Sequence, residues 1–227
     1  VLRQWGLDIR DGYGQTETCS MVAYAGGQEA LLRPDTVGRP LPITDAKIID
    51  PETGAPAAPG QAGELVVRGA QISAGYWKDG AIHPIADAEG WVRTGDAAVI
   101  DNGFVVLRDR LKDVIKRGGE SVFSFEVEEA IAQHPDVLEV AVVGLPDEHW
   151  GEVVAAAVVA KNPAVLDEDM LRSHCANELA RFKIPRHFVL RNELPRNAGG
   201  KVLKSELRTQ LREYLRHTHY THKGVGK

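Results

Sequence analysis

The sequence predicts an α+β protein in which a small β-barrel or distorted-sheet subdomain precedes a compact α+β domain. Two observations carry this prediction. Short β-type segments separated by Pro and Gly fill the first 110 residues, and helical and strand patterns alternate after about residue 111. Helices and strands that alternate in this way pack on one sheet. With 43% hydrophobic and 26% charged residues among 227, the composition is that of a folded globular chain.

Strands separated by turns are expected in the first part of the chain. Asn102-Gly103 supplies the positive φ angles that a tight hairpin turn requires. Segment 51–63, with three prolines and three glycines, is expected to be a surface loop. The strand candidates around these turns are 46–50, 64–68, 97–100 and 104–107.

Alternating helices and strands are expected after about residue 111. The first helix is expected over 125–133, with Ser124 as its N-cap, two glutamates in its first turn and one apolar face. The composition changes near 110–113, which places a domain boundary there. The further candidates are strands 137–143, 153–160 and 187–190, a helix over 170–179 and a last helix with Leu207, Leu211 and Leu215 at four-residue spacing.

Charge, apolar runs and cysteines exclude several classes of protein. The net charge of −5 gives no electrostatic reason to bind nucleic acid. The longest apolar run, 153–160, is far shorter than the ~20 residues that span a bilayer. Cys19 and Cys175 have no metal-binding or CxxC spacing, so a cytoplasmic location is expected. The first residues lack an initiator Met and a signal-peptide pattern, and we interpret them as a cut inside a longer protein.

The segment Gly12-Tyr-Gly-Gln-Thr-Glu17 has the residue types of a nucleotide-binding turn. Its glycines let the backbone approach a flat ligand, and Tyr13 offers a ring for stacking. The Thr16 hydroxyl suits a phosphate oxygen, and the Glu17 carboxylate suits Mg²⁺. Taken alone, the segment is explained at least as well by an ordinary polar turn.

Two segments further along add a carboxylate and a fixed positive charge. Asp96, directly after Gly95 at a strand junction, can accept two hydrogen bonds from a ribose diol. The Arg110 guanidinium can hold ribose or phosphate oxygens. Lys112 lies where the composition changes and suits a hinge between domains. A β-turn aspartate and a charged surface hairpin are the alternative interpretations.

Two glycine-rich basic loops complete the candidates. Lys116 precedes Gly118-Gly119, which permits a tight turn or the close passage of a slender ligand. Lys201 follows two glycines on what is expected to be a mobile, open loop, from which its charge can stabilise an anionic transition state. In isolation, a solvated lysine on a glycine loop is the simpler interpretation.

Taken together, in this order and spacing, the motifs resemble the adenylate-forming superfamily, which includes acyl- and aryl-CoA ligases. The resemblance runs from about Asp11 to Leu215. Such enzymes join a carboxylic acid to AMP with release of pyrophosphate, and then transfer the acyl group to a thiol. The resemblance implies ATP, Mg²⁺ and CoA as ligands and a place in fatty acid metabolism. Further similar segments are 63–69, 75–77 and 146–152.

The resemblance also implies roles for single residues. Lys201 would be the adenylation lysine. After rotation of the C-terminal domain about Lys112, the 116–120 hairpin would replace Lys201 and line the pantetheine channel. Segment 121–124 departs from the usual Asn and aromatic–Pro pair at this place. The implied nucleotide contacts are Tyr13 with adenine, Gly14 and Gln15 in the same segment, Thr16 with the α-phosphate, Glu17 with Mg²⁺, and Asp96 with the ribose hydroxyls, with Arg110 close by.

The same resemblance divides the chain into parts. Residues 1–37 would end the nucleotide-binding region of a large N-terminal domain, 38–110 would form a β-rich subdomain, and 111–227 a mobile C-terminal α+β domain. The family's Ser/Thr/Gly-rich phosphate loop has no counterpart in this sequence. The chain is therefore expected to be part of an acid–CoA ligase and inactive alone. Its expected partners are a small carboxylic acid, CoA, the missing N-terminal domain and a second copy in a homo-oligomer.

Two alternatives have a different character. The chain could be a non-catalytic remnant or an interaction module with the same fold, although retention of all the candidate charged residues favours an enzyme. His217, His219 and His222 could form a metal site, but their spacing is irregular for one helix face, so a solvated tail is favoured.

Overall fold

The computed structural model describes residues 6, 10–163 and 165–222, with side chains up to Arg216. The chain divides between Lys112 and Asp113 into two compact units. This division lies within the 110–113 segment at which the composition changes. Strands and helices are both present, so the α+β class predicted from the sequence is confirmed.

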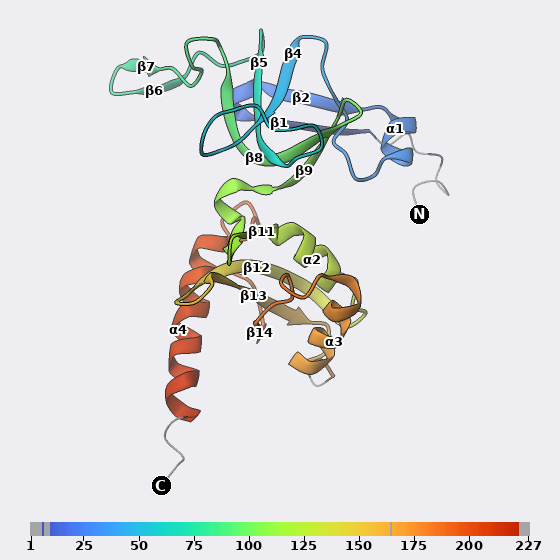
Figure 1. Cartoon of the computed structure of the whole chain (residues 1–227), viewed down its shortest axis with the longest axis vertical. Helices are drawn as coiled ribbons and strands as arrows, with labels where there is room; N and C mark the ends of the chain where they lie inside the picture. The colour runs from blue at the N-terminus through green and yellow to red at the C-terminus, as the bar shows by residue number, and fades with distance from the viewer. Residues whose placement is uncertain (1–5, 7–9, 164, 223–227) are drawn as a thin grey trace. The chain divides into compact units, whose positions relative to one another are not determined.

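The first unit starts with a three-stranded antiparallel sheet in the order β1-β2-β3 (Figure 1). A register shift follows Tyr13 in β1, where the strand passes into the turn toward β2. The elements are β1 (Asp11–Gln15), the 3₁₀ helix η2 (Thr16–Thr18), β2 (Ser20–Ala25), the short helix α1 (Gly27–Leu32) and β3 (Arg39–Pro40).

A four-stranded antiparallel sheet, β4-β5-β8-β9, forms the rest of this unit's core. The four predicted strands are confirmed, and register shifts within β5–β8 and β8–β9 distort the sheet as expected. Tyr13 and Val22 of the first sheet pack with Leu65 and Val105 of this one. The strands are β4 (Thr44–Ile49), β5 (Gly63–Gly69), β8 (Val92–Asp101) and β9 (Phe104–Arg110), and the 3₁₀ helix η3 (Leu111–Asp113) follows.

Two tight hairpins of the same kind occur in this unit. The β8–β9 turn has φ angles of 51° at Asn102 and 81° at Gly103, so the predicted hairpin is confirmed. A second hairpin, β6 (Tyr76–Lys78) with β7 (Ala81–His83), escaped the sequence analysis. Its turn at Asp79-Gly80 has φ angles of 52° and 78°. Asp-Gly is a hairpin signal, but the flanking strands are too short to show an alternating pattern.

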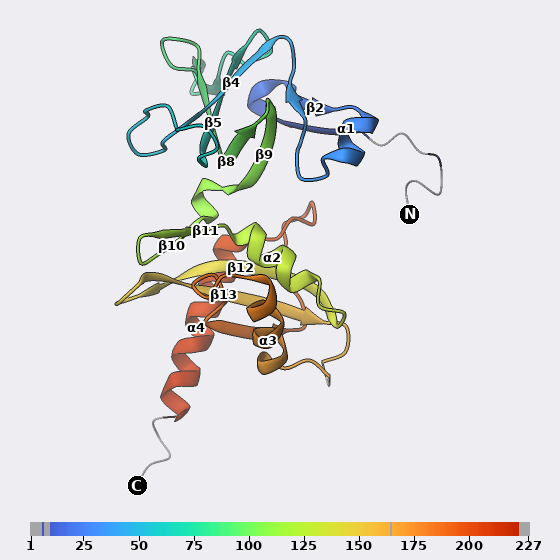
Figure 2. The same ribbon diagram turned by 45° about the vertical axis from the view of Figure 1, so that its right-hand side comes forward.

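The second unit is a five-stranded sheet with helices on both faces (Figure 2). β13 explains why both faces are covered: Val154, Ala156 and Val158 pack under α2 and α3, whereas Val153 and Ala155 pack under α4. The unbroken apolar run is therefore a strand buried on both sides. The elements are β10 (Ile115–Arg117), β11 (Glu120–Val122), α2 (Ser124–Ala132), β12 (Val137–Asp147), β13 (Gly151–Ala160), α3 (Glu168–Glu178), β14 (His187–Arg191) and α4 (Lys204–His222).

The start of α2 corrects one prediction. Phe123, not Ser124, occupies the N-cap position, and it provides no side-chain cap. Ser124 is fully buried as the first helical residue, and its hydroxyl accepts a hydrogen bond from Lys204 Nζ at 2.6 Å. At α3, the cap is Asp167, whose side chain accepts from the Met170 N–H at 2.8 Å.

Candidate active site

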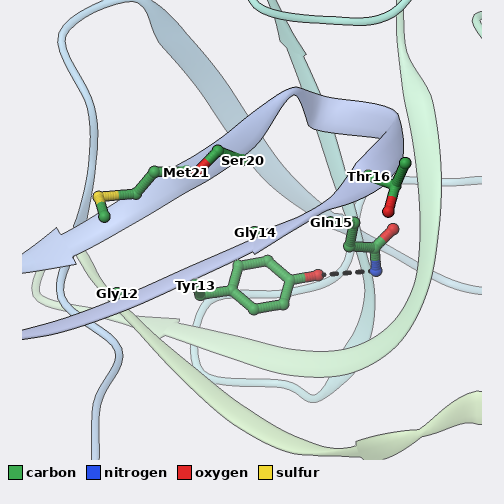
Figure 3. A pocket seen from close by; sticks show the side chains of 7 residues that line it. All are labelled: Gly12, Tyr13, Gly14, Gln15, Thr16, Ser20 and Met21. Carbon is green, nitrogen blue, oxygen red and sulfur yellow. Dashed lines mark hydrogen bonds between the residues drawn. The ribbon is translucent and has the colours of Figure 1, made fainter. Parts of the chain in front are cut away.

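An open hollow of about 540 Å³ lies along the turn between β1 and β2 (Figure 3). The two strands approach so closely that a Cβ added to Gly14 would lie 1.4 Å from the Ser20 carbonyl oxygen. Only glycine fits there, so Gly14 is first of all a structural requirement of this turn. The lining residues are Gly12, Tyr13, Gly14, Gln15, Thr16, Ser20 and Met21.

Asp96 lies beside this turn as the most heavily bonded carboxylate of the predicted site. It is 4% exposed, and it sits opposite Arg110 in the β8–β9 register. Arg110 Nε lies 2.8 Å from Asp96 Oδ1. Oδ2 accepts the Tyr13 hydroxyl at 2.5 Å and Gln15 Nε2 at 2.8 Å. The structure therefore brings β1, β8 and β9 residues, from three segments of the sequence, into one network.

The Tyr13 and Gln15 side chains support this network from β1. Burial raises the pKa of the Tyr13 hydroxyl, and its hydrogen bond to Asp96 raises it further. Tyr13 therefore stays a neutral donor to the carboxylate. Gln15 Nε2 also contacts the Tyr13 hydroxyl at 3.2 Å and donates to the Thr94 carbonyl at 2.9 Å. Because the Tyr13 ring is largely buried, its stacking on adenine stays a prediction.

Two residues that the sequence analysis did not single out hold the Asp96 turn. The buried Thr94 hydroxyl donates to the Leu65 carbonyl at 2.7 Å and accepts the Asp96 N–H at 3.1 Å. Glu64, 3% exposed, accepts the Gly95 N–H at 3.1 Å and also binds Arg93. A glutamate within the apolar run of β5 was the available signal, because a buried charge needs partners.

Thr16 and Glu17 lie at the exposed end of the same turn, in η2. Thr16 is exposed and lines the hollow. Glu17 accepts a hydrogen bond from the Tyr76 hydroxyl of the β6–β7 hairpin, and the Glu17 carbonyl accepts the Ser73 N–H at 2.9 Å. The Tyr76 hydrogen bond lowers the pKa of Glu17, and the pKa of Tyr76 rises correspondingly. The Glu17 carboxylate is therefore ionised at neutral pH. The residue is half-buried.

In the second unit, the predicted basic hairpin is β10–β11. Gly118 and Gly119 have φ angles of 59° and 89°, which suit glycine at this turn. Lys116 Nζ lies 3.0 Å from Ser121 Oγ. The Gly118 N–H donates to the Trp150 carbonyl at 2.8 Å, and a Cβ at Gly118 would lie 2.7 Å from the Trp150 ring. Trp150 is thus a contact of the hairpin that sequence spacing did not reveal.

Lys201 lies on an exposed loop between β14 and α4. The loop backbone is not open: the Asn197 N–H donates to the Lys201 carbonyl at 2.9 Å, and Asn197 Oδ1 accepts the Lys201 N–H at 2.9 Å. The predicted openness therefore applies to the lysine side chain and not to the backbone. Lys112, the expected hinge residue, is exposed within η3.

Two family models match the chain on either side of these features. The model described as the AMP-binding enzyme matches residues 1–77, and that of the AMP-binding enzyme C-terminal domain matches 126–201. This chain belongs to the adenylate-forming superfamily. The first match includes the Gly12–Glu17 turn, and the second ends at Lys201, so the family models cover segments from both units.

Two curated relatives are named as an acyl-CoA synthetase and a CoA ligase. A putative acyl-CoA synthetase, YngI, of Bacillus subtilis is 39% identical over 217 residues, which cover 94% of this chain and 40% of the relative. A 2-succinylbenzoate–CoA ligase of Geobacillus kaustophilus is 39% identical over 207 residues, 91% of this chain and 42% of the relative. The chain thus spans about two fifths of the length of the curated relatives it matches.

Solved structures of the superfamily have the same fold. o-Succinylbenzoate CoA synthetase from Bacillus subtilis, in complex with its acyl-adenylate intermediate, aligns with a TM-score of 0.82 and 33% identity over 91% of this chain and 42% of its own. ATP-bound MatB from Rhodopseudomonas palustris aligns with a TM-score of 0.82 and 34% identity over 93% and 43%. An amide bond synthetase from Marinactinospora thermotolerans aligns at 0.78 and 34%, over 88% and 42%.

A magnesium ion fits the Gly12–Glu17 turn only if a ligand's phosphates supply further oxygen ligands. The part of the chain that the structure describes contains no group of three or more His, Cys, Asp or Glu side chains that could hold a metal. Mg²⁺ commonly binds through one or two carboxylates together with substrate phosphates. Glu17 offers one such carboxylate, whose Oε1 accepts a hydrogen bond from the Tyr76 hydroxyl.

Three further expectations concern histidines, thiols and membrane-spanning helices. The side chains of His217, His219 and His222 lie outside the described residues. Cys19 is exposed and Cys175 is buried, and both are free thiols. Among the described helices, none has the length and apolar character needed to cross a membrane.

Proposed function

We propose that this chain is the part of an ATP-dependent acid–CoA ligase that binds the nucleotide and carries the adenylation lysine. The observation that supports it most directly is the buried Asp96 carboxylate, held by Tyr13, Gln15 and Arg110 beside an open hollow. Fixed donors and acceptors at the edge of a hollow suit the recognition of a polar ligand. The curated CoA ligases of the superfamily support the assignment of the reaction class.

The proposed roles follow from where each side chain lies. Asp96 Oδ1 has one partner in Arg110, so it retains capacity to accept a hydrogen bond from a ribose hydroxyl. Thr16, exposed at the hollow, would donate to the α-phosphate. Glu17 would hold Mg²⁺, which when bound neutralises phosphate charge.

The second unit would serve the two half-reactions in turn. The exposed Lys201 ammonium would stabilise the charge that builds on the phosphoryl oxygens while the carboxylate attacks the α-phosphorus. Lys116 and the Gly118-Gly119 turn would then serve transfer of the acyl group to the thiol of CoA. Rotation of this unit between the steps, with Lys112 as the hinge residue, is part of the proposal.

The experiment that tests this function separates the chain from the rest of the ligase. ATP–pyrophosphate exchange and thioester formation are measured with a panel of acids, first with the 227-residue chain alone and then with the upstream portion of the ligase added. Fatty, arylacetic and dicarboxylic acids belong in the panel, and an amine belongs beside CoA as the acceptor. Activity only with the upstream portion is the expected result.

Two outcomes contradict the proposal in different ways. Exchange by the 227-residue chain alone would show that it needs no further phosphate loop. No activity in either mixture, with the chain shown to be folded, would favour a non-catalytic remnant or an interaction module.

We further propose a cytoplasmic location, which the two free thiols support, and assembly into a homo-oligomer.

A further inference from the structure

The loop that carries Lys201 is closed at its base by backbone pairing. Arg196 and Val202 form an antiparallel bridge, and the Leu203 N–H donates to the Pro195 carbonyl at 2.8 Å. Helix α4 begins immediately after this base. The Nζ of its first residue, Lys204, lies 2.7 Å from Oε1 of Glu128 on α2. The loop therefore leaves and rejoins the unit at one anchored point.

Asn197 closes the rest of the loop through both its side chain and its backbone. Its Oδ1 accepts the N–H of Gly199 at 3.1 Å and of Lys201 at 2.9 Å. Its own N–H donates to the Lys201 carbonyl at 2.9 Å, and its carbonyl accepts the Gly200 N–H at 2.9 Å. Both backbone polar groups of Lys201 are thus bonded to Asn197. Asn suits this position because its short side chain reaches backbone N–H groups a few residues ahead.

Arg196 fixes the same loop to the sheet. Its Nη1 donates to the Gly200 carbonyl at 2.6 Å, and its Nη2 lies 2.8 Å from Glu139 on β12. Gly200 has a φ angle of 82°, so the backbone turns sharply just before Lys201. Hydrogen bonds rather than burial hold this turn, because Asn197, Gly200 and Lys201 are all exposed.

We propose that Asn197 is a positioning residue for adenylation, which sets the direction in which the Lys201 side chain leaves the loop; this inference rests on the proposed function. A charge stabilises a transition state best when it is already in place, and a displacement of about 1 Å can cost about 100-fold in rate. The Lys side chain is long and flexible, so its backbone is the part that the protein can fix. Asn197 fixes the N–H and the carbonyl of that backbone.

The test uses the complete ligase, formed by this chain and its upstream portion, and measures the two half-reactions separately. Asn197→Ala is expected to lower kcat of ATP–pyrophosphate exchange by about 10- to 100-fold with little change in the KM for ATP. Transfer of the acyl group from supplied acyl-adenylate to CoA should change less than about twofold. Asn197→Asp keeps the acceptor oxygen and should retain most of the exchange activity. Asn192→Ala, an exposed substitution in the bend after β14, is the matched control and should change neither half-reaction.

A second readout needs no activity. Amide hydrogen exchange, measured on the 227-residue chain, should be faster at the Gly199 and Lys201 N–H groups in Asn197→Ala and close to the unsubstituted rate in Asn197→Asp. An unchanged rate of hydrogen exchange at these two amides in Asn197→Ala would overturn the assignment, as would an equal loss of both half-reactions. An unsubstituted complete ligase without exchange activity would instead overturn the proposed function, and this assignment with it.

Discussion

The two units hold their candidate side chains in opposite ways. In the first, Asp96 is 4% exposed, and its oxygens already accept from three side chains. In the second, Lys116 and Lys201 are exposed, and the hydrogen bonds hold chiefly their backbones. A buried, multiply bonded carboxylate cannot change position without breaking those bonds, which suits one ligand kept through a whole reaction. Exposed charges on fixed backbones suit groups that are needed in one step only.

Removing the Lys201 ammonium should give the largest effect on activity and the clearest contrast between the two units. Lys201→Ala in the complete ligase is expected to lower ATP–pyrophosphate exchange by about 100- to 1,000-fold, the usual cost of losing one group that stabilises transition-state charge. Acyl transfer from supplied acyl-adenylate and the free energy of unfolding should hardly change, because the side chain is exposed. Arg212→Ala, an exposed change on α4, is the control. Equal loss of both half-reactions would contradict separate roles for the two loops.

Breaking the Asp96 network should, in contrast, lower the stability of the first unit as well as weaken nucleotide binding. Asp96→Ala leaves the Tyr13 hydroxyl and the Gln15 amide without this acceptor, and the free energy of unfolding of the first unit should fall by about 3 kcal/mol. Urea denaturation checks this value. Asp45→Ala removes an exposed ion pair with Arg68 and should cost less than about 1 kcal/mol. Similar losses in both variants would remove the contrast between buried and exposed sites.

The β10–β11 turn allows a comparison within one unit. Gly118→Ala and Gly119→Ala both place a side chain at positive φ, but only the first meets the Trp150 ring. We expect a loss of about 1 kcal/mol in the free energy of unfolding at Gly119 and about 2 kcal/mol at Gly118. Thioester formation should slow more in Gly118→Ala. In a Trp150→Ala background the stability difference should disappear, and its persistence would exclude the ring as the cause.

The Tyr76–Glu17 contact should give the smallest effect and is best detected by titration. Tyr76→Phe is expected to raise the pKa of Glu17 toward its ordinary value of 4.5, as followed by carboxyl ¹³C NMR. Because the pKa is lower in the folded state, the added stability is fully present above pH 4.5. It is lost as the pH falls through the lowered pKa. Tyr24→Phe is the control, since Tyr24 contacts Arg10 instead. An unchanged Glu17 titration in Tyr76→Phe would show that another group sets the pKa.

Much of the fold was predictable because its signals are local. The Asn102-Gly103 turn needs positive φ angles, and residues 153–160 of the doubly buried β13 form an unbroken apolar run, so each can be recognised from neighbouring residues alone. The Ser124 cap was wrong for the opposite reason. Lys204, eighty positions along the chain, lies against Ser124, and this tertiary contact overrides the capping preference.

The candidate site divides along the same line. The sequence by itself determined which residue types are present: the Gly12–Glu17 turn, Asp96, Arg110 and the glycine loops before Lys201. Only the tertiary structure decided their partners. It placed Asp96 against Tyr13 and Gln15, and it placed Trp150 over Gly118. Hydrogen bonds and ring contacts form between groups within a few ångströms in space, and strand pairing brings such groups together from distant positions in the sequence.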